Sequence, residues 1–345
     1  MKKKSACRTS FFMLNYIHLY SITEFLMKNG EADMLYFIAN ETARTGKGEG
    51  VWRTVQKEIR ARKIPYKVFM TKHNGHATEL AKMVSEMEEE DINLIVVGGD
   101  GTLNEVINGV TDFEKVRISL IPAGSGNDFA RNLGITKEPI ARLEHILSIV
   151  EKAEESFERI DLGQVEWGER KEKRLYAISS GVGMDALVCK KMMTSKVKVL
   201  MNKLGLGKVS YLIVTIQSLF GMEKADMAIN IDGSGTQNFK GGIFAAAMNA
   251  KAEGGGVPMA PKASVQDGLL SVCIAHKFTK VGALFRLPFL AIGKHQNFHG
   301  FKVFDCKNMQ IKIKKPMALH TDGEYLGDVT ELTYSCLPGK MRFMV

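Results

Sequence analysis

Cysteine is scarce in this chain, and the few cysteines are too far apart for the common cysteine-based scaffolds. The 345 residues contain five cysteines, and no two of them form a C-x-x-C pair. Zinc sites and disulfide-rich secreted domains both rely on closely spaced or framework cysteines. We therefore expect free thiols and a reducing, cytoplasmic environment.

Long apolar runs are also missing. No segment reaches the roughly 18 uninterrupted apolar residues of a membrane-spanning helix. The chain begins with the letters MKKK and superficially resembles a signal peptide, but Asn15, His18 and Glu24 interrupt the apolar stretch that follows. No small-residue cleavage site follows either. We expect residues 1–33 to be a poorly ordered N-terminal extension, and we assign it no function.

Two nucleotide-binding signatures are absent or misplaced. The pattern G-x-x-x-x-G-K-[S/T] does not occur, which excludes a P-loop enzyme. Gly181–Ala186 fits a relaxed G-x-G-x-x-A pattern, but it lies outside any βαβ unit, so a Rossmann dinucleotide site is not expected there.

Positive charge is in excess. The formal net charge is +9 and the isoelectric point is near 9.1. Such a balance favours a polyanionic partner, namely nucleic acid, an anionic membrane or a phosphate-rich ligand. Composition does not choose among these three.

The first half of the chain alternates between strand and helix patterns. A helix is predicted over Val51–Lys63, after a Gly- and Lys-containing turn at Thr45–Gly50, and a second helix carries an apolar stripe made of Leu80, Met83, Val84 and Met87. Short apolar runs predict strands at Met34–Ala39, Ile92–Val97 and Val116–Ile121, and a further strand is predicted at Tyr66–Met70. Alternating βαβα order with fully apolar strands predicts a doubly wound, mostly parallel sheet in an α/β domain over 34–155.

The second half follows a different pattern. Met309–Lys314 alternates apolar and polar residues, which is typical of half-buried antiparallel strands. Similar strands are predicted at Ala228–Ile231, Gly242–Met248 and Leu270–Ala275. We therefore expect a β-rich antiparallel domain over 156–345, whose last strand has the option of returning to the first domain.

The most informative stretch is GGDGTLNE at 98–105, directly after a predicted strand. Thr102 and Glu105 have the spacing of a capping box, so a helix is predicted to start there. Glycines at such a turn let the backbone approach a ligand, and the helix N-terminus offers N–H groups to an anion. Because Asp100 would repel a phosphate, a bridging divalent cation is expected.

Two further turns of this kind follow neighbouring strands. One is PAGSGND at 122–128, and the other begins at Asn40. The carboxyl ends of successive parallel strands share one edge of the sheet, where ligands bind in open α/β folds. Three such turns with two embedded aspartates predict a nucleotide site at this edge.

Taken together, GGDGTLNEVING at 98–109, PAGSGNDFARNLG at 122–134 and HTDGE at 320–324 resemble the bacterial diacylglycerol kinase-like lipid kinases, relatives of the sphingosine kinases. The resemblance covers the chain from Met34 to the C-terminus. It implies an NAD kinase-like fold, in which a nucleotide domain is followed by a β-rich lipid-substrate domain. It also implies transfer of the ATP γ-phosphate to diacylglycerol to give phosphatidic acid.

The resemblance implies roles by position. Asp100 and Asp128 match acidic residues that organise catalytic Mg²⁺, while the Asp267 carboxylate with the Ser264 and Leu269 carbonyls resembles a second, structural Mg²⁺ site. Glu324 is the expected proton acceptor, supported by Asp322, although the sequence does not separate these two. The ATP-contacting set comprises Asn40, Glu41, Thr42, Ala43, Arg44, Thr71, Gly99, Asp100, Gly101, Thr102, Leu103, Asn104, Glu105 and Ser125. Relatives usually carry Asn-Pro where this chain has Asn40-Glu41.

A basic segment favours the membrane among the polyanionic partners. Leu187–Met222 contains no Asp or Glu but carries Lys190, Lys191, Lys196, Lys198, Lys203 and Lys208 among apolar residues. Near an anionic lipid surface each lysine is worth about 1 kcal/mol. We expect peripheral association with the inner face of the membrane and no nucleic-acid partner.

The sequence by itself leaves three alternative functions open. They are a soluble NAD kinase-like enzyme, a kinase of another lipid such as a sphingoid base, and a non-catalytic nucleotide-binding regulator. The oligomeric state stays open, a homodimer included.

Overall fold

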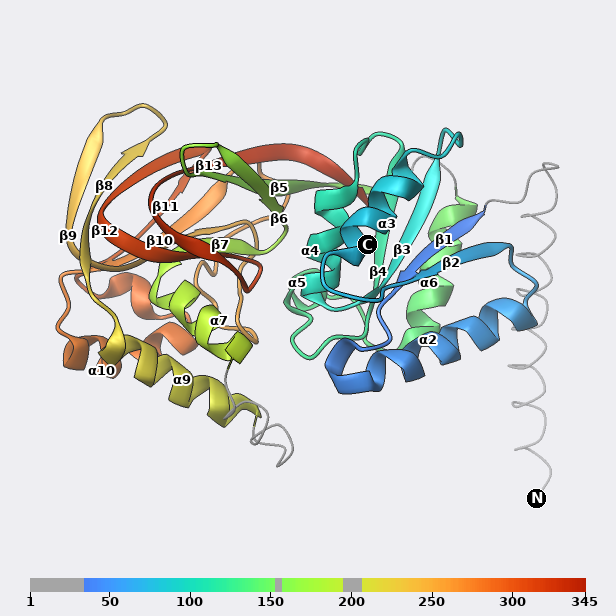
Figure 1. Ribbon diagram of the computed structural model, residues 1–345, viewed down its shortest axis with the longest axis horizontal. Coiled ribbons are helices and arrows are strands. Elements are labelled where there is room, and N and C mark those ends of the chain that lie inside the picture. The colour runs from blue at the N-terminus through green and yellow to red at the C-terminus, as the bar shows by residue number, and fades with distance from the viewer. Residues whose placement is uncertain (1–33, 153–156, 195–206) are drawn as a thin grey trace, which may run out of the picture. The chain divides into compact units, whose positions relative to one another are not determined.

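The computed structural model describes residues 34–152, 157–194 and 207–345, so the predicted N-terminal extension lies outside the described residues. Contacts divide the chain into two units (Figure 1). Unit 1 comprises Met1–Ser125, Ile135–Glu158 and Arg342–Val345, and unit 2 comprises Gly126–Gly134 and Arg159–Met341. The chain passes between the two units after residues 125, 134, 158 and 341.

Unit 1 is built on a parallel sheet with the strand order β2-β1-β3-β4. The strands are β1 (Leu35–Ala39), β2 (Tyr66–Met70), β3 (Ile92–Gly98) and β4 (Val116–Pro122). Arg342 and Phe343, at the end of β13 (Glu324–Phe343), pair in parallel with β4. Strands β1 and β3 are buried along their whole length, as continuous apolar runs in a helix-covered parallel sheet must be. The predicted doubly wound α/β fold is confirmed.

Helices cover both faces of this sheet (Figure 1). On one face α2 (Ala43–Ala61) and α6 (Pro139–Glu151) pack with Phe37, Ile95 and Val97 into an apolar core. The other pair, α3 (His76–Ser85) and α4 (Asp100–Gly109), is closely packed. A side chain at Gly109 would come within 2.2 Å of the Thr78 carbonyl, so only glycine permits this approach.

Two details of these helices differ from the prediction. Helix α2 begins at Ala43, so the predicted turn at Thr45–Gly50 lies within it. In α3 the buried positions include Ala77, Ala81 and Val84, whereas Met83 is exposed. The predicted stripe was right for Val84 and wrong for Met83, because the close approach to α4 places the small side chains of Ala77 and Ala81 on the buried face.

Helix α4 also starts earlier than predicted. It begins at Asp100 behind an extended Gly99, with no side chain capping it. Thr102 lies in its first turn, and the Glu105 carboxylate instead accepts a hydrogen bond of 3.0 Å from the Ala77 backbone N–H. The predicted capping box was wrong: Glu105 caps the N-terminus of α3, where a negative charge is stabilised.

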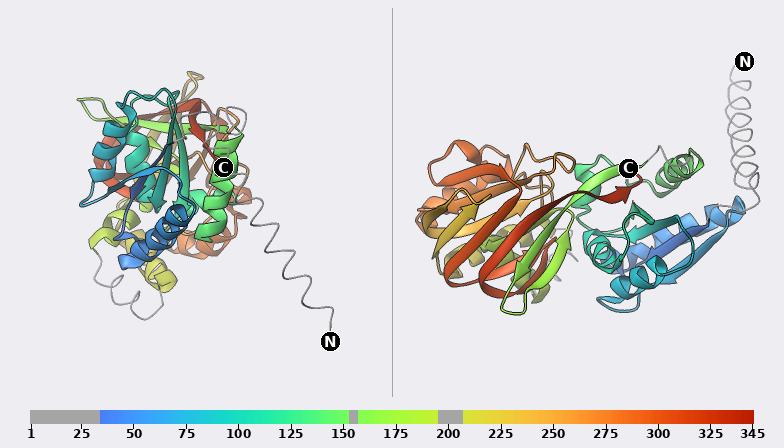
Figure 2. Two further views of the ribbon diagram at one scale, coloured as in Figure 1. Left: turned by 90° about the vertical axis from the view of Figure 1, so that its right-hand side faces the viewer. Right: turned by 90° about the horizontal axis from the view of Figure 1, so that it is seen from above.

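Unit 2 is an antiparallel β-rich body, as predicted (Figures 1 and 2). Its strands run in the order β11-β10-β9-β7-β12-β13, with β8 pairing β9 and β12 and with β5 pairing β6. They are β5 (Glu158–Trp167), β6 (Glu172–Tyr176), β7 (Ser179–Gly183), β8 (Ala225–Ile231), β9 (Thr236–Met248), β10 (Leu270–His276), β11 (Phe301–Cys306), β12 (Asn308–Thr321) and β13. Gly181–Ala186 crosses from an antiparallel strand into a helix, which excludes the Rossmann motif there.

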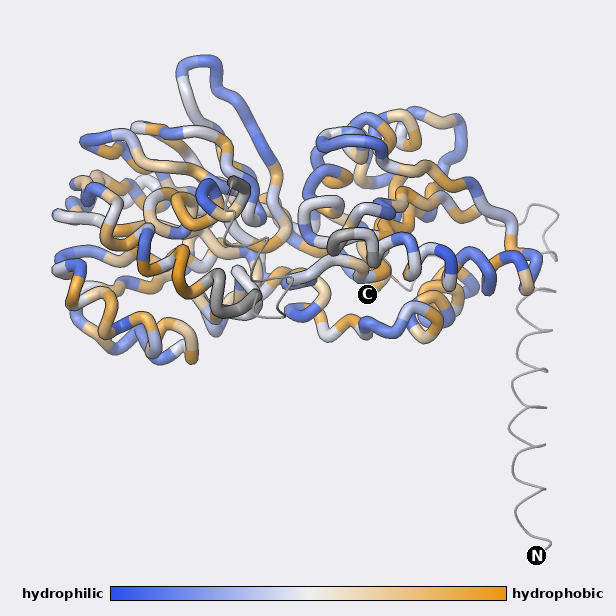
Figure 3. Tube along the Cα trace, turned by 60° about the horizontal axis from the view of Figure 1, so that its bottom comes forward, coloured by the Kyte–Doolittle hydropathy of each residue, from blue (hydrophilic) through white to orange (hydrophobic). Residues whose placement is uncertain are grey.

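Helices flank this β body. They are α5 (Asp128–Asn132), α7 (Met184–Thr194), α9 (Gly207–Gly221) and α10 (Lys280–Ala291), with a short 3₁₀ helix at His295–Asn297. The interior is a single large cluster in which Phe244, Ile274 and Leu319 are buried. Figure 3 colours the chain by hydropathy, and hydrophobic stretches, in orange, occur in both units. Among the described residues, no helix combines the length and the hydrophobicity needed to cross a membrane.

Candidate active site

The loops of unit 1 that follow β1 and β3 meet at the point where the strand order reverses. In the sheet β1 and β3 are neighbours. From β1 the chain continues outward to β2 on one side, and from β3 it continues outward to β4 on the other side. Asn40 follows β1, and its Nδ2 donates a hydrogen bond of 3.0 Å to Thr102 Oγ1 in the first turn of α4. This edge is where open α/β sheets bind ligands.

Glycines allow the backbone to pack tightly around these two loops. A Cβ at Gly48 would lie 2.3 Å from the Asn40 carbonyl oxygen, and one at Gly98 would lie 2.7 Å from the Thr102 side chain. Both positions therefore require glycine. Of the glycines that suggested a turn at 45–50, Gly48 instead lets helix α2 lie directly against the Asn40 loop.

The structure brings most of the predicted ATP-contacting residues to this one edge of unit 1. Thr71 follows β2, and its N–H donates to the Ala39 carbonyl at 2.9 Å. Glu41 and Thr42 are exposed, and Thr42 Oγ1 donates to Asn40 Oδ1 at 2.8 Å. Gly99–Asn104 forms the start of α4, and exposed Ser125 ends the loop after β4. Glu105 is the exception, because its carboxylate is engaged with α3.

Asp128, a predicted Mg²⁺ residue, belongs to unit 2. It is buried at the start of α5 behind Asn127, whose φ is 51°. Its Oδ2 accepts a hydrogen bond of 2.8 Å from the Gly255 N–H, and its Oδ1 forms an ion pair with Arg131. Because the Asp128 carboxylate is buried, its negative charge requires a nearby positive charge, and Arg131 provides it.

The HTDGE turn separates its two carboxylates by environment. Asp322 has a φ of 45° and accepts hydrogen bonds from the backbone N–H groups of Ala177, Ile178 and Ser179 at 2.9–3.0 Å. A carboxylate with this many amide donors holds a loop in place. Glu324 is more exposed, and its Oε2 forms a 2.5 Å ion pair with Arg174 Nη2. The geometry gives Asp322 a positioning role and leaves Glu324 at the surface of the turn.

The Ser264–Leu269 turn lies against a carboxylate that the sequence analysis missed. Asp161 is buried in β5, and it accepts the Gly268 N–H at 2.7 Å and the Gly339 N–H at 2.6 Å. Burial raises the pKa of Asp267, and the charge of Asp161 adds to the increase. Two carboxylates at one turn are chemically suited to a hard cation such as Mg²⁺, which takes oxygen ligands.

A second acidic group in unit 2 was also missed. Ligand atoms of Asp185, Glu253 and His320 all lie within 4.8 Å of one another. His320 is buried; its Nε2 lies 3.3 Å from Asp185 Oδ2, and its Nδ1 accepts the Gly323 N–H at 3.3 Å. Since Nδ1 is an acceptor, the proton of the neutral ring is on Nε2, facing Asp185. That proton occupies the position a metal ion would need, so the group is better suited to holding a proton.

The protonation of this group is shifted by its surroundings. Burial raises the pKa of Glu253 to about 7, with His320 opposing and Asp185 adding to the increase. Burial alone would lower the pKa of His320, but the hydrogen bond to Asp185 and the nearby negative charges raise it overall. The sequence signal that could have found the group is weak, because its members are 67 or more positions apart.

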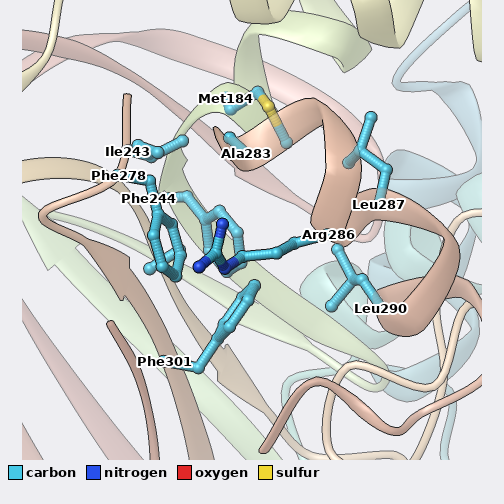
Figure 4. A pocket seen from close by; sticks show the side chains of 10 residues that line it. Met184, Ile243, Phe244, Phe278, Ala283, Arg286, Leu287, Leu290 and Phe301 are labelled. Atoms are coloured by element: carbon cyan, nitrogen blue, oxygen red, sulfur yellow. The ribbon is translucent and has the colours of Figure 1, made fainter. Parts of the chain in front are cut away.

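Unit 2 also contains an apolar hollow between α10 and the sheet (Figure 4). Its lining includes Met184, Phe244, Leu287 and Phe301, and the one charged residue in the lining is Arg286. The Arg286 guanidinium lies 4.5 Å from the centre of the Phe278 ring, which is a cation–π contact. In Figure 4 the Arg286 side chain reaches in among the aromatic rings.

Comparisons with known proteins agree with this architecture. Residues 34–165 match the diacylglycerol kinase catalytic domain, and residues 178–345 match the YegS C-terminal NAD kinase β-sandwich-like domain. The α/β unit with its glycine-rich edge and the β sandwich together define an ATP-dependent lipid kinase.

Three individual proteins are similar to this chain over most of its length. The chain is 31% identical over 309 residues to the provisionally named lipid kinase YtlR of Bacillus subtilis, which covers 89% of this chain and 98% of that protein. It is 29% identical to a diacylglycerol kinase of the same organism, over 73% of this chain and 77% of the relative. A solved structure of a provisionally assigned diacylglycerol kinase from Bacillus anthracis has the same fold, with a TM-score of 0.69 at 21% identity, covering 90% of this chain and 97% of that one. The chain belongs to the diacylglycerol kinase-like family of lipid kinases.

Proposed function

We propose that this enzyme transfers the γ-phosphate of ATP to the free hydroxyl of diacylglycerol at the inner face of the membrane, giving phosphatidic acid. The observation that carries the choice of a diacyl lipid is the match of residues 34–165 to the diacylglycerol kinase catalytic domain, together with relatives named diacylglycerol kinase. The apolar hollow of unit 2 agrees with an apolar ligand, since nine of its lining residues are apolar and Arg286 is the tenth. Its cavity volume is only about 10 Å³, room for roughly one water molecule, so an acyl chain would have to displace lining side chains. The hollow offers few partners to the sugars and amides of a soluble dinucleotide, which a site must hydrogen-bond when it buries them.

The reaction joins the lipid hydroxyl oxygen to the γ-phosphorus and breaks the bond from that phosphorus to the β–γ bridging oxygen, releasing ADP. The start of α4 supplies backbone N–H groups to the phosphates. Glu324 takes the hydroxyl proton, and Arg174, paired with it at 2.5 Å, holds the carboxylate in one orientation. Asp322 keeps the turn in place through its three amide donors.

The proposed reaction also requires Mg²⁺, for which two sets of residues are proposed as ligands. Asp100 would be a ligand of the catalytic ion, which would neutralise phosphate charge, since a helix N-terminus contributes only about 0.3–1 kcal/mol toward an anion. Asp128, the other ligand that the resemblance implies, belongs to unit 2 and pairs with Arg131 in the protein itself. Asp267, with the Ser264 and Leu269 carbonyls, would hold a structural ion. The Asp161 carboxylate beside that turn increases the negative charge available to a cation.

The basic segment is part of the proposed membrane contact. Within its described part, Lys190 pairs with Asp328 at 3.2 Å and lies over the Tyr325 ring, and Lys191 donates to the Gln217 carbonyl. Lys196, Lys198 and Lys203 lie outside the described residues. Lys190 and Lys191 are thus engaged with the protein, and Lys208 lies in α9 with its side chain outside what the structure describes. The proposed membrane contact therefore includes further residues.

The test is incubation with radiolabelled ATP, Mg²⁺ and acceptors presented in mixed micelles: diacylglycerol, monoacylglycerol, sphingosine and, in solution, NAD. We expect label in phosphatidic acid, lost on chelation of Mg²⁺. Label in sphingosine alone would replace the acceptor by a sphingoid base, and label in NAD alone would make this a soluble small-molecule kinase.

A further inference from the structure

Helix α10 is apolar on all sides although one of its faces is at the surface. Of its 12 residues only Lys280 and Arg286 are charged. Surface helices of soluble domains normally carry polar residues on the outer face. A helix without such a face is typical of a segment that is covered by something other than water.

The outer face of α10 carries a continuous apolar stripe. Val281, Phe285, Phe289 and the C-cap residue Ile292 follow one another at i, i+4, i+8 and i+11, and all four are exposed. Phe285 is 71% exposed and Ile292 is 61% exposed, which is unusual for an aromatic and a β-branched aliphatic side chain. We call these four residues the α10 stripe.

Helix α9 adds to this surface. Its last turn ends beside the first residue of α10, because Lys280 Nζ donates a hydrogen bond of 2.6 Å to the Phe220 carbonyl. The ring of Phe220 is itself exposed. A second link runs from Lys224 Nζ to the Phe278 carbonyl at 3.0 Å. The exposed apolar surface is therefore shared by two neighbouring helices.

The segment that carries the stripe has charges of one sign, and Glu223, the acidic side chain near Lys280, is paired with Lys315. Residues 268–304 contain no aspartate or glutamate, and the segment carries Lys277, Lys280, Arg286, Lys294 and Lys302. Lys277, Lys294 and Lys302 are exposed. Apolar residues flanked by lysines are the pattern of helices that lie in the boundary between headgroups and acyl chains.

We propose that α10 is the helix by which this enzyme enters an anionic lipid surface. The α10 stripe lies among the acyl chains, and the surrounding lysines contact lipid phosphates. The inference rests on the proposed lipid acceptor, and it assigns the main contact to α10, outside the Leu187–Met222 segment, with Phe220 of that segment beside it. The inner face of the same helix lines the apolar hollow with Leu287 and Leu290, so the docking element and the hollow share one helix.

The charge pattern favours a membrane over a second copy of the chain as the occupant. In a two-fold dimer the same surface meets itself, and its lysines would face each other. Juxtaposed like charges oppose association, whereas an anionic bilayer complements them.

The experiment measures vesicle binding without ATP, so its result does not depend on which acceptor is phosphorylated. The full chain is sedimented with vesicles of phosphatidylcholine containing phosphatidylglycerol and, separately, with phosphatidylcholine alone. A double variant, Phe285→Ser with Ile292→Ser, removes two exposed apolar side chains. Met83→Ser, at an exposed apolar residue of α3 in unit 1, is the matched control.

We expect the double variant to bind anionic vesicles at least tenfold more weakly, while Met83→Ser matches the parent. Phe285→Trp should show tryptophan quenching by brominated lipids, and Met83→Trp should not. This second readout holds even if the double variant is unstable. Parental binding by the double variant, or no quenching of Phe285→Trp, would overturn the inference. So would a lipid-free dimer of the parent that the double variant dissociates, since the stripe would then be a subunit interface.

Discussion

Replacing Glu253 by glutamine tests the electrostatics of the buried group that it forms with Asp185 and His320. Glutamine keeps the size of the side chain and can still accept the hydrogen bond that Ser179 Oγ donates to Glu253. It removes the carboxylate whose charge is disfavoured by burial and by Asp185. The variant therefore isolates the cost of ionising this position.

The sign and the size follow from the pKa of Glu253. Folding raises this pKa from 4.5 to about 7, so the folded state holds the proton more tightly than the unfolded state does. The stabilisation is complete below pH 4.5 and is lost as the pH rises through about 7. The full interval corresponds to roughly 3 kcal/mol at the usual free energy per pH unit. His320 offsets part of this cost when its ring is protonated, because a positive charge there favours the ionised carboxylate.

We expect Glu253→Gln to gain about 1–3 kcal/mol of unfolding free energy over the parent at pH 8, and little gain at pH 4.5, where the folded carboxyl is protonated and the unfolded one is half protonated. Urea unfolding followed by circular dichroism at both pH values measures the difference. Glu331→Gln, at an exposed strand position, is the control and should show no pH-dependent gain. An equal effect of Glu253→Gln at the two pH values, or a loss at pH 8, would refute the reasoning.

Four other variants test separate parts of the proposal. Glu324→Gln should lower kcat at least about 10²-fold with little change in the lipid KM, and near-parental turnover would remove Glu324 as proton acceptor. Asp322→Asn should cost about 1.5–3 kcal/mol of unfolding free energy, because a charged acceptor of three amide hydrogen bonds is lost; unchanged stability would contradict its positioning role. Asp267→Asn should abolish the rise in Tm that Mg²⁺ causes in the parent, and an unchanged rise would place the structural ion elsewhere. Glu105→Gln should destabilise the fold by about 0.3–1 kcal/mol, with the loss shrinking in high salt, since its charge lies at the N-terminus of α3.

The parallel sheet of unit 1 could be predicted because its strands are encoded locally. A strand covered by helices on both faces must be largely apolar, so a run such as Met34–Ala39 marks a strand without any knowledge of the fold. The observed β1, Leu35–Ala39, is buried at every position. The polar and glycine-rich turns that follow β1, β3 and β4 then fall on one edge, because parallel strands align their carboxyl ends.

Local patterns misled wherever close packing decided the outcome. Glycines at 46, 48 and 50 indicated a turn, yet Gly48 is needed so that α2 can lie against the Asn40 carbonyl. Glu105 had the spacing of a capping partner for Thr102, but the nearer unsatisfied donor is the Ala77 N–H of the neighbouring helix. Spacing along the chain contains no information about such a neighbour.

The chain by itself therefore determined the two kinds of sheet, the turns at the carboxyl edge of unit 1 and the carboxylate pair of the HTDGE turn. Only the tertiary structure decided how those two carboxylates differ, because Asp322 receives its amide donors from residues 177–179, more than 140 positions earlier. The same holds for Glu253, Asp185 and His320, which come from separate parts of unit 2. A pKa depends on burial and on charges a few ångströms away, and antiparallel strands from distant parts of the chain bring those charges together.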